Sequence, residues 1–236
     1  MRALILAAGL GSRLRPLTED VPKPLVNYKG NSLLKHQINS LRSNNINELT
    51  IVTGYLSDKL VSFLKEFDDM KIDTIFNPDY SECSSAFSAY LALKDLDEDY
   101  IHINCDVLFN SQLLKRLLED SRKNILCVRS DLVLTDSMEN AVGVNGRLVN
   151  MSLRPSNEAK FKAFGLAKIS KEALKENLKF YSKFNNSSQR AENYYGLIRM
   201  NLGNEDYFYI ETDKKSLSEI NSMKDLQDCE FVPDLV

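Results

Sequence analysis

The sequence predicts an α/β fold: a mixed, mostly parallel sheet flanked by helices, with an antiparallel hairpin inserted in its second half. Short apolar runs alternate with amphipathic stretches along residues 1–130, and an Asn-Gly turn follows at 145–146. No low-complexity linker or internal repeat separates the two halves. The 236 residues are therefore expected to form one domain, 1–236.

The first half is predicted to contain five strands and four helices, and successive βα units favour parallel strands with helices on both faces. Each strand is a short apolar run, and each helix carries apolar residues on one face, as at Leu34, Ile38 and Leu41. Ser57 is expected to cap the second helix, which extends to Phe67. The strands are expected at 3–6, 49–53, 72–76, 100–104 and 125–128, and the other helices at 32–44, 84–96 and 111–121.

The second half has a different pattern. Residues 142–149 predict a hairpin, because Asn-Gly is the preferred two-residue turn between antiparallel strands. Two further strands, two helices joined by a loop, and a short closing helix follow. The strands are expected at 161–169 and 207–210, the helices at 170–184 and 188–202, the loop at 185–187 and the closing helix at 223–226.

Composition excludes several classes of protein. With 30 Lys and Arg against 33 Asp and Glu, the net charge of −3 argues against a dedicated nucleic-acid binder. The longest uncharged stretch, 83–93, is too short to span a bilayer, and the N-terminus has no signal-peptide pattern. Four scattered cysteines are typical of free thiols in a reducing cytoplasm, and with two histidines no zinc site is expected.

The N-terminal loop predicts an anion-binding site. A buried strand leads into a Gly- and Ala-rich loop, 6–12, and Arg13 and Arg15 follow at once. Glycines let backbone N–H groups approach an anion, whereas the dinucleotide fingerprint is excluded because Leu14 replaces its third glycine. Lys23 stands between two prolines and projects from a rigid loop. A tight turn with solvated arginines is the alternative.

Together these segments resemble the signature of the nucleotidylyltransferase superfamily, which joins a nucleoside triphosphate to a phosphorylated small molecule. Residues 5–18 and 22–25 match its pattern, apolar-Ala-Ala-Gly-x-Gly-x-Arg-Leu-x-Pro-Leu-Thr and then Pro-Lys-Pro-Leu, nearly throughout. The resemblance implies the Rossmann-like fold of nucleotide-diphospho-sugar transferases. It also implies a nucleotide-binding half, 1–130, and an acceptor-binding half, 131–236.

The resemblance implies that Arg13 and Lys23 grip the triphosphate and the incoming phosphate. Such a transfer depends on positioning and charge, and the attacking phosphate is already ionised, so no general base is required. The residues assigned to catalysis are Arg13, Lys23 and Asp106. Those assigned to the nucleotide are Leu6, Ala7, Ala8, Gly9, Gly11, Ser12, Arg13, Lys23, Ser84, Ser85, Ser88 and Asn104.

Asp106 follows an apolar strand directly, at the edge where open α/β sheets bind their ligands. The family places a metal-binding aspartate there, so the resemblance implies that Asp106 holds Mg²⁺; a turn or capping aspartate is the alternative. Residues 217–226 resemble the family's Trp-x-Glu-Ile-Asp-x-x-x-Asp-Leu, but Asn221 replaces the aspartate that shares the metal. Asn221 and Glu219 are the remaining candidate ligands.

Residues 77–88 favour CTP among the nucleotides. The segment lacks the Gln and the Pro-x-Gly-Leu-Ala of sugar-1-phosphate nucleotidylyltransferases and resembles the Asn-x-x-Tyr-x-x-x-Asn-Asn-x-x-Ser segment of phosphocholine-type cytidylyltransferases. Ser84 and Ser85 replace its asparagines, and Ser88 keeps its serine. Hydroxyls can bind a pyrimidine edge, and capping of the helix by Ser84 or Ser85 is the alternative.

Phe164, Tyr194 and Tyr195 are assigned to the acceptor. Aromatic faces can hold a quaternary ammonium group by cation–π attraction, and filling of the core is the alternative. Because the chain has no Trp, the best residue for such a cage, other phosphorylated amines, amino acids or phosphonates fit equally well.

Three functions follow. The first is a Mg²⁺-dependent cytidylyltransferase that releases pyrophosphate and makes a CDP-linked molecule for a surface glycan or lipid. The second is a sugar-1-phosphate nucleotidylyltransferase. The third is a non-catalytic nucleotide-binding relative, which Asn221 favours and Arg13, Lys23 and Asp106 oppose. The expected partners are a nucleoside triphosphate and a phosphorylated small molecule in the cytoplasm, without nucleic acid or membrane, and homodimerisation is left open.

Overall fold

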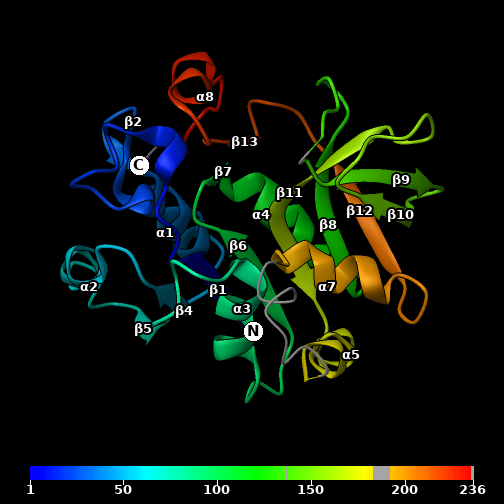
Figure 1. The fold of residues 1–236 in the computed structure, drawn as a ribbon, viewed down its shortest axis with the longest axis horizontal. Helices are drawn as coiled ribbons and strands as arrows, with labels where there is room; N and C mark the ends of the chain where they lie inside the picture. Colours follow the sequence, from blue (N-terminus) through cyan, green and yellow to red (C-terminus); the bar gives the residue numbers. More distant parts are fainter. Residues whose placement is uncertain (137, 183–191, 235–236) are drawn as a thin grey trace.

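The computed structural model describes residues 1–136, 138–182 and 192–234 and is built on a nine-stranded sheet of order β5-β4-β1-β6-β11-β8-β12-β10-β9 (Figure 1). The predicted α/β architecture is confirmed. The strands are β1 (Arg2–Ala7), β4 (Glu48–Thr53), β5 (Lys71–Phe76), β6 (Tyr100–Asn104), β8 (Asn124–Arg129), β9 (Asn140–Val144), β10 (Arg147–Ser152), β11 (Phe161–Ile169) and β12 (Tyr207–Glu211).

Seven strands run in one direction, and β10 and β11 run against them. β1 pairs in parallel with both β4 and β6, so Ala3 lies between Leu49 and Ile101. The long strand β11 is antiparallel to β6 on one side and to β8 on the other. β11 lies between β6 and β8 in the sheet, because the chain returns after the hairpin and pairs with both strands.

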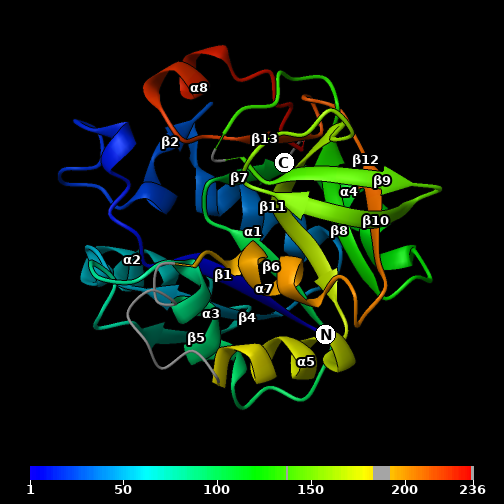
Figure 2. The same ribbon diagram turned by 45° about the vertical axis from the view of Figure 1, so that its right-hand side comes forward.

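Two layers of helices cover the sheet, as predicted. Side chains of a strand alternate between its faces, so Ile5 packs toward α1, α2 and α4, and Leu4 packs toward α3, α5 and α7. Figure 2 shows the second group of helices in front of the sheet. The helices are α1 (Leu33–Ser43), α2 (Ser57–Leu64), α3 (Ser85–Leu93), α4 (Ser111–Glu119), α5 (Lys171–Ser182), α7 (Tyr194–Asn201) and α8 (Met223–Asp228).

Small elements outside the main sheet bring distant segments together. β7 (Val107–Phe109) pairs with β13 (Leu217–Glu219), and the backbone N–H of Ile220 donates to the carbonyl of Asp106 at 2.9 Å. This pairing, which the sequence did not predict, places the residues after β13 beside the end of β6. Two single-turn 3₁₀ helices, η1 (Ser12–Leu14) and η2 (Lys23–Leu25), and a short hairpin of β2 (Asn27–Tyr28) and β3 (Asn31–Ser32) complete the N-terminal loops.

The predicted hairpin is confirmed, but several helix boundaries differ from those predicted, including the end of α4 at Glu119 rather than at 121. Asn145 and Gly146 have φ of 51° and 81°, as the two-residue turn requires. Ser57 does not cap α2: Leu56 holds the cap position with φ 49°, and the Ser57 hydroxyl donates to Thr53 Oγ1 instead. α2 ends at Leu64 rather than Phe67, and α3 ends at Leu93 rather than at 96.

Within the described residues, α7 is the observed part of the second predicted late helix. α7 starts at Tyr194, because the Asn193 side chain accepts a hydrogen bond from the Gly196 N–H at 3.0 Å and caps it. The predicted start at 188 and the predicted loop at 185–187 lie outside the described residues.

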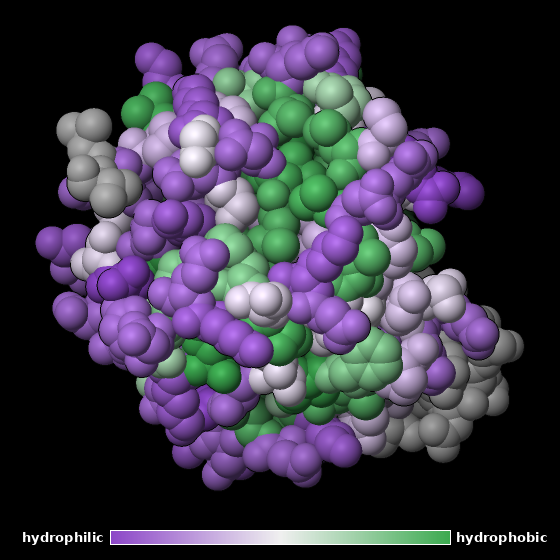
Figure 3. Space-filling view, turned by 90° about the vertical axis from the view of Figure 1, so that its left-hand side faces the viewer, coloured by the Kyte–Doolittle hydropathy of each residue, from purple (hydrophilic) through white to green (hydrophobic). Residues whose placement is uncertain are grey.

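The surface carries hydrophobic as well as polar regions. Figure 3 shows hydrophobic residues gathered in the upper half of one face, between hydrophilic borders. Across the described chain the exposed hydrophobic residues include Leu10, Leu17 and Val21 of the N-terminal loops. No helix within the described ranges is long and apolar enough to span a membrane.

Candidate active site

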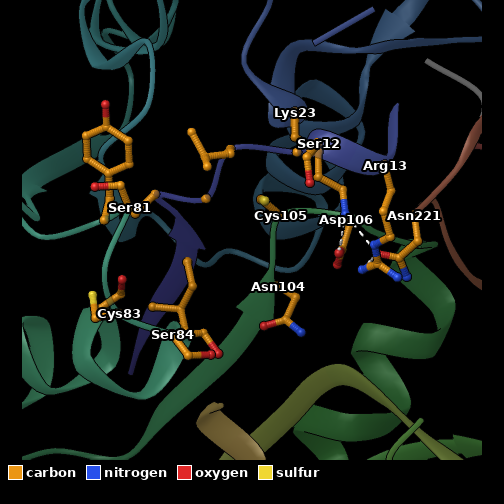
Figure 4. A pocket seen from close by; sticks show the side chains of 18 residues that line it. Ser12, Arg13, Lys23, Ser81, Cys83, Ser84, Asn104, Cys105, Asp106 and Asn221 are labelled. Carbon is orange, nitrogen blue, oxygen red and sulfur yellow. Dashed lines mark hydrogen bonds and ion pairs between the residues drawn. The ribbon is translucent and has the colours of Figure 1, made fainter. Parts of the chain in front are cut away.

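A cavity of about 450 Å³ opens where β1 and β6 end, at their carboxyl edge (Figure 4). This is the edge at which α/β sheets bind ligands, and the volume suits a nucleotide-sized molecule. The cavity joins segments far apart in sequence. It is lined by Leu6, Ala8, Gly9, Leu10, Gly11, Ser12, Arg13, Lys23, Tyr80, Ser81, Cys83, Ser84, Ser85, Ser88, Asn104, Cys105, Asp106 and Asn221.

The N-terminal loop is folded back on itself so that Lys23 reaches the cavity. Gly11 has φ +65°, and a Cβ there would lie only 3.1 Å from the Lys23 Cβ and 3.2 Å from the Thr18 Cγ2. The buried Thr18 hydroxyl donates to the Gly11 carbonyl at 2.8 Å and closes the turn. Glycine is therefore required at this position by both conformation and close approach.

Four side chains form a charged cluster at one end of the cavity (Figure 4). Lys23 Nζ donates to Asp106 Oδ2 at 2.7 Å and to Asn221 Oδ1 at 2.9 Å. Arg13 Nη2 donates to the same Asn221 oxygen at 2.8 Å. Burial alone would lower the pKa of Lys23, but the Asp106 carboxylate holds it above its usual value. Lys23 is thus a fixed ammonium group, and two cations face one neutral amide.

Within this cluster, Asp106 is the residue that suits a metal ion. Its Oδ1 is buried and has no hydrogen-bond partner among the described residues, whereas its Oδ2 is paired with Lys23. An unpaired carboxylate oxygen in such a place is costly unless a cation or donor meets it. Within the described ranges no group of three or more His, Cys, Asp or Glu gathers to hold a metal. Asp106 therefore fits a metal shared with phosphate oxygens, which needs one or two protein carboxylates.

The serines form the opposite side of the cavity, on and before α3 (Figure 4). Ser84 holds the cap position of α3, yet its side chain makes no capping hydrogen bond. Ser85 Oγ accepts from the Tyr194 backbone N–H at 2.9 Å, and Ser88 Oγ accepts from Asn77 Nδ2 at 3.0 Å. The alternative of side-chain capping is thus not realised, and Ser85 instead ties α3 to α7.

Most of the residues assigned to the nucleotide line this cavity, but Ala7 does not. Ala7 is 1% exposed and its side chain packs in the core on the opposite face of β1. Strand alternation explains this, because Leu6 faces the cavity and the next side chain must face away. Tyr80 and Cys83 also line the cavity and were not assigned, although both lie in the segment that suggested CTP.

A second cavity of about 320 Å³ adjoins the first and shares Arg13, Ser85, Asn104 and Asn221 with it. Tyr194 and Tyr195 line the second cavity, as assigned. Its other lining residues are Thr135, Asp136, Met138, Glu139, Lys162, Ala163, Gly165, Asn193, Glu219 and Asp225. Carboxylates thus outnumber cations on its wall.

Phe164, also assigned to the acceptor, does not line this cavity. Alternation along β11 turns Ala163 and Gly165 toward the second cavity and Phe164 to the opposite face, where it packs in the core. Its ring lies under Lys162 and Arg129, with Lys162 Nζ 4.5 Å from the ring centroid. The two tyrosines are also core residues, with 1% and 4% of their surface exposed. The aromatic rings therefore form a packed wall and no open cage.

Glu219 faces the second cavity and forms an ion pair with Lys162. Burial alone would raise the pKa of Glu219, but the Lys162 ammonium lowers it below its usual range. The Glu219 carboxylate is thus charged and already paired in this structure. Of the three residues assigned to the metal, Asp106 offers a free oxygen, Asn221 accepts from two cations, and Glu219 is held by Lys162.

Comparison with known proteins shows which family the chain belongs to. Residues 3–147, more than half of the chain, match the family described as the MobA-like NTP transferase domain. The chain is 30% identical over 199 residues to the CTP:phosphoglutamine cytidylyltransferase of Campylobacter jejuni, a match that covers 77% of this chain and 78% of that protein. It is 40% identical over 101 residues to a choline-phosphate cytidylyltransferase of Streptococcus pneumoniae, and this match spans 43% of either chain.

The fold has a close counterpart among solved structures. The CTP:phosphocholine cytidylyltransferase from Streptococcus pneumoniae (LicC) superposes with a TM-score of 0.81, covering 97% of both chains at 24% sequence identity. At this identity the likeness shows the nucleotide-diphospho-sugar transferase fold. Together with the family match and the long alignment to the phosphoglutamine enzyme, it identifies the chain as a member of the MobA-like NTP transferase domain family, and so as a nucleotidyltransferase.

Proposed function

We propose that the chain is a cytidylyltransferase that transfers CMP from CTP to a phosphorylated or phosphonate-bearing small molecule. An oxygen of the acceptor's phosphate attacks the α-phosphorus of CTP and forms the new P–O bond. The bond from that phosphorus to the bridging oxygen breaks, and pyrophosphate leaves with the electron pair. The observation that carries the proposal is the Lys23–Asp106–Asn221–Arg13 cluster at the border of two cavities.

The two cavities support a division of labour between the halves of the chain. The first cavity is lined by residues of 1–130, apart from Asn221, and is proposed to bind the nucleotide. Most of the wall of the second cavity comes from 131–236, and this cavity is proposed to bind the acceptor. Arg13 lines both cavities, so its charge would meet phosphate groups from either substrate.

CTP is favoured by the serine side of the first cavity and by the relatives. The Ser84 hydroxyl makes no capping bond and lines the cavity, so it is available to a base edge. Relatives named for phosphocholine, phosphoglutamine and aminopropylphosphonate chemistry are cytidylyltransferases or make CMP-linked products. Sugar-phosphate enzymes are also among the relatives, so nucleotide selectivity is a property to measure.

Mg²⁺ is proposed to bind at Asp106 Oδ1, with Asn221 as a weak or water-mediated ligand. The unpaired buried oxygen of Asp106 supports this placement. When bound, the ion would neutralise charge on the phosphate oxygens. The residues of this chain add two further functions: Lys23 holds Asp106 in place through its Oδ2, and Arg13 offers a guanidinium to the phosphates.

The second cavity supports an acceptor that carries an amine. Asp136, Glu139, Glu219 and Asp225 line it, against Arg13 and Lys162; Glu139 is ion-paired with Arg199 and Glu219 with Lys162, which leaves Asp136 and Asp225 as the carboxylates proposed to meet the amine. A quaternary ammonium would prefer open aromatic faces, whereas the Tyr194 ring is covered by the His102 ring at 3.4 Å between centroids. A primary amine can donate hydrogen bonds to carboxylates directly. A CDP-linked product of this kind, made in the cytoplasm, would serve the synthesis of a surface glycan or lipid.

The proposal is tested by product analysis with purified protein, Mg²⁺ and CTP. Phosphoethanolamine, an aminoalkylphosphonate, an amino-acid phosphate, phosphocholine and glucose-1-phosphate are each supplied as acceptor. ³¹P NMR should show a new CDP- or CMP-linked product and stoichiometric pyrophosphate with at least one amine-bearing acceptor. Product with glucose-1-phosphate alone would move the protein to the sugar class, and no product with any acceptor would favour a non-catalytic relative.

A further inference from the structure

Asn104 occupies the border between the two cavities. It is the last residue of β6 and lines both the first and the second cavity. In Figure 4 it stands between the serines on one side and Arg13 and Asn221 on the other. Among the described residues no protein atom accepts a hydrogen bond from its Nδ2 group. The amide therefore has a free donor at the place where the two substrates of the proposed reaction would meet.

The buried His102 side chain contacts this amide and limits its orientation. His102 is 0% exposed, and its Nε2 lies 3.1 Å from Asn104 Oδ1. Its ring stacks on Tyr194 with 3.4 Å between centroids and 6° between planes, so the imidazole cannot turn freely. Tyr194 is itself held by a 2.7 Å hydrogen bond to the Tyr100 hydroxyl.

With the Asn104 oxygen facing His102, the contact favours one tautomer of the imidazole. Its Nδ1 is buried and has no partner in the described part of the chain. A proton on Nε2 gives a donor to Asn104 Oδ1, whereas a proton on Nδ1 would leave two lone pairs facing each other across 3.1 Å. With Nε2–H donating, the Asn104 oxygen is occupied, and its NH₂ group is the part that faces the cavities.

Gly165 also limits the position of the amide, because its backbone lies close to the Asn104 side chain. It lies on β11, next to β6 in the sheet, and a Cβ built on it would lie 2.4 Å from the Asn104 Cβ and 2.5 Å from Nδ2. Such distances are far below van der Waals contact, so a side chain at 165 would displace the amide. The close approach of Gly165 therefore restricts where the Asn104 amide can lie.

We propose that His102 is a positioning residue for nucleotidyl transfer, and that it orients Asn104 so that its NH₂ group donates to a phosphate oxygen at the border of the cavities. This role rests on the proposed function. It complements the charged cluster, because Asn104 supplies a neutral directed donor where Arg13 and Lys23 supply charge. His102 itself lines neither cavity, so it acts through Asn104.

A double-mutant cycle tests the proposal in the full-length protein with Mg²⁺, CTP and the acceptor found active for the wild type. His102→Phe keeps a flat ring on Tyr194 and removes the N–H donor, and Asn104→Ala removes the amide. Each change alone should lower kcat by about tenfold, with a smaller change in KM, because the interaction acts on the transferred group. In the Asn104→Ala background, His102→Phe should have no further effect on kcat.

His36→Phe is the matched control. His36 is also buried, but its Nε2 lies 2.8 Å from the Tyr28 carbonyl, away from both cavities, so kcat should stay at the wild-type value. Gly165→Ala is the second route to the same amide, and it should mimic Asn104→Ala and be non-additive with it. Thermal unfolding of each variant shows that it is folded.

The outcomes distinguish failure of the proposed function from failure of the positioning role of His102. No turnover by the wild type would refute the proposed function itself. If the wild type turns over but His102→Phe keeps full kcat, or lowers it equally with and without Asn104, the positioning role is wrong. If His102→Phe does not fold, Gly165→Ala decides in its place, and a wild-type kcat in that variant overturns the proposal.

Discussion

At the scale of single residues, the charged cluster holds a neutral amide, Asn221, where the resemblance implies a second carboxylate. Asn221 accepts hydrogen bonds from both Arg13 and Lys23, and so contributes geometry without charge. Asp106 is then the one carboxylate in the cluster, and its Oδ1 is free within the described residues. The affinity of the proposed Mg²⁺ site should accordingly be lower than that of a site with two carboxylates.

We expect Asn221→Asp to tighten Mg²⁺ binding several-fold, seen as a lower Mg²⁺ concentration for half-maximal turnover. Asp106→Asn should nearly abolish turnover, because it removes the one carboxylate of the cluster and so the proposed anchor of the metal. Calorimetric titration with Mg²⁺ and CTP gives an independent readout of the same affinity. Turnover only after Asn221→Asp, with none in the wild type, would favour the non-catalytic nucleotide-binding relative.

Lys23→Ala should lower kcat by about 10²-fold or more while the fold survives, because a preorganised charge at a reacting phosphate is worth several kcal/mol. Lys29→Ala is the matched control: Lys29 Nζ donates to the Phe231 carbonyl at 2.7 Å, outside both cavities. Steady-state kinetics with circular dichroism on both variants make the comparison. Near-normal turnover after Lys23→Ala would contradict the assignment of the cluster.

At the scale of elements, the sequence predicted those strands and helices that depend on local patterns of apolar residues. β11 was predicted at its observed bounds, Phe161–Ile169, because the segment is rich in apolar residues, which is typical of a strand buried on both faces. The pairing of β7 with β13 was not predicted, since it joins segments about a hundred residues apart and each is only three residues long. That pairing is what brings Asn221 to Asp106. The side chains of Ala7 and Phe164 face away from the cavities for a simpler reason: strand alternation decides which of two neighbours faces a cavity.

The C-terminal segment should stabilise the contact between α1 and α4. The Asp234 carboxylate accepts from the Ser111 backbone N–H at 2.9 Å, the Ser111 hydroxyl at 2.8 Å and the Ser40 hydroxyl at 3.0 Å. Asp234→Ala should lower the free energy of unfolding by about 1 kcal/mol, since it removes a charged acceptor at the start of a helix. Urea unfolding of this variant and of the exposed-site variant Asp68→Ala compares the two, and an equal effect would contradict the role.

At the scale of the whole molecule, one buried histidine should make stability depend on pH. Burial lowers the pKa of His102 to about 3, whereas an unfolded chain titrates near ~6.5. Between these pKa values the unfolded state binds a proton at His102 that the native state does not bind. The free energy of unfolding is therefore unaffected by His102 above about pH 6.5 and falls as the pH drops toward 3. Urea unfolding at pH 7 and pH 4 should show a smaller loss for His102→Phe than for the wild type, and equal losses would contradict the burial of a neutral imidazole.

The central claim, cytidylyl transfer at the border of the two cavities, is tested most directly by nucleotide selectivity of turnover. Pyrophosphate release is followed with Mg²⁺, an amine-bearing phosphorylated acceptor and each of CTP, UTP, ATP, GTP and dTTP, for the wild type and for Lys23→Ala. The account predicts the highest kcat/KM with CTP, and its loss in the variant. A clear preference for GTP or dTTP, or equal release by the two proteins, would contradict it.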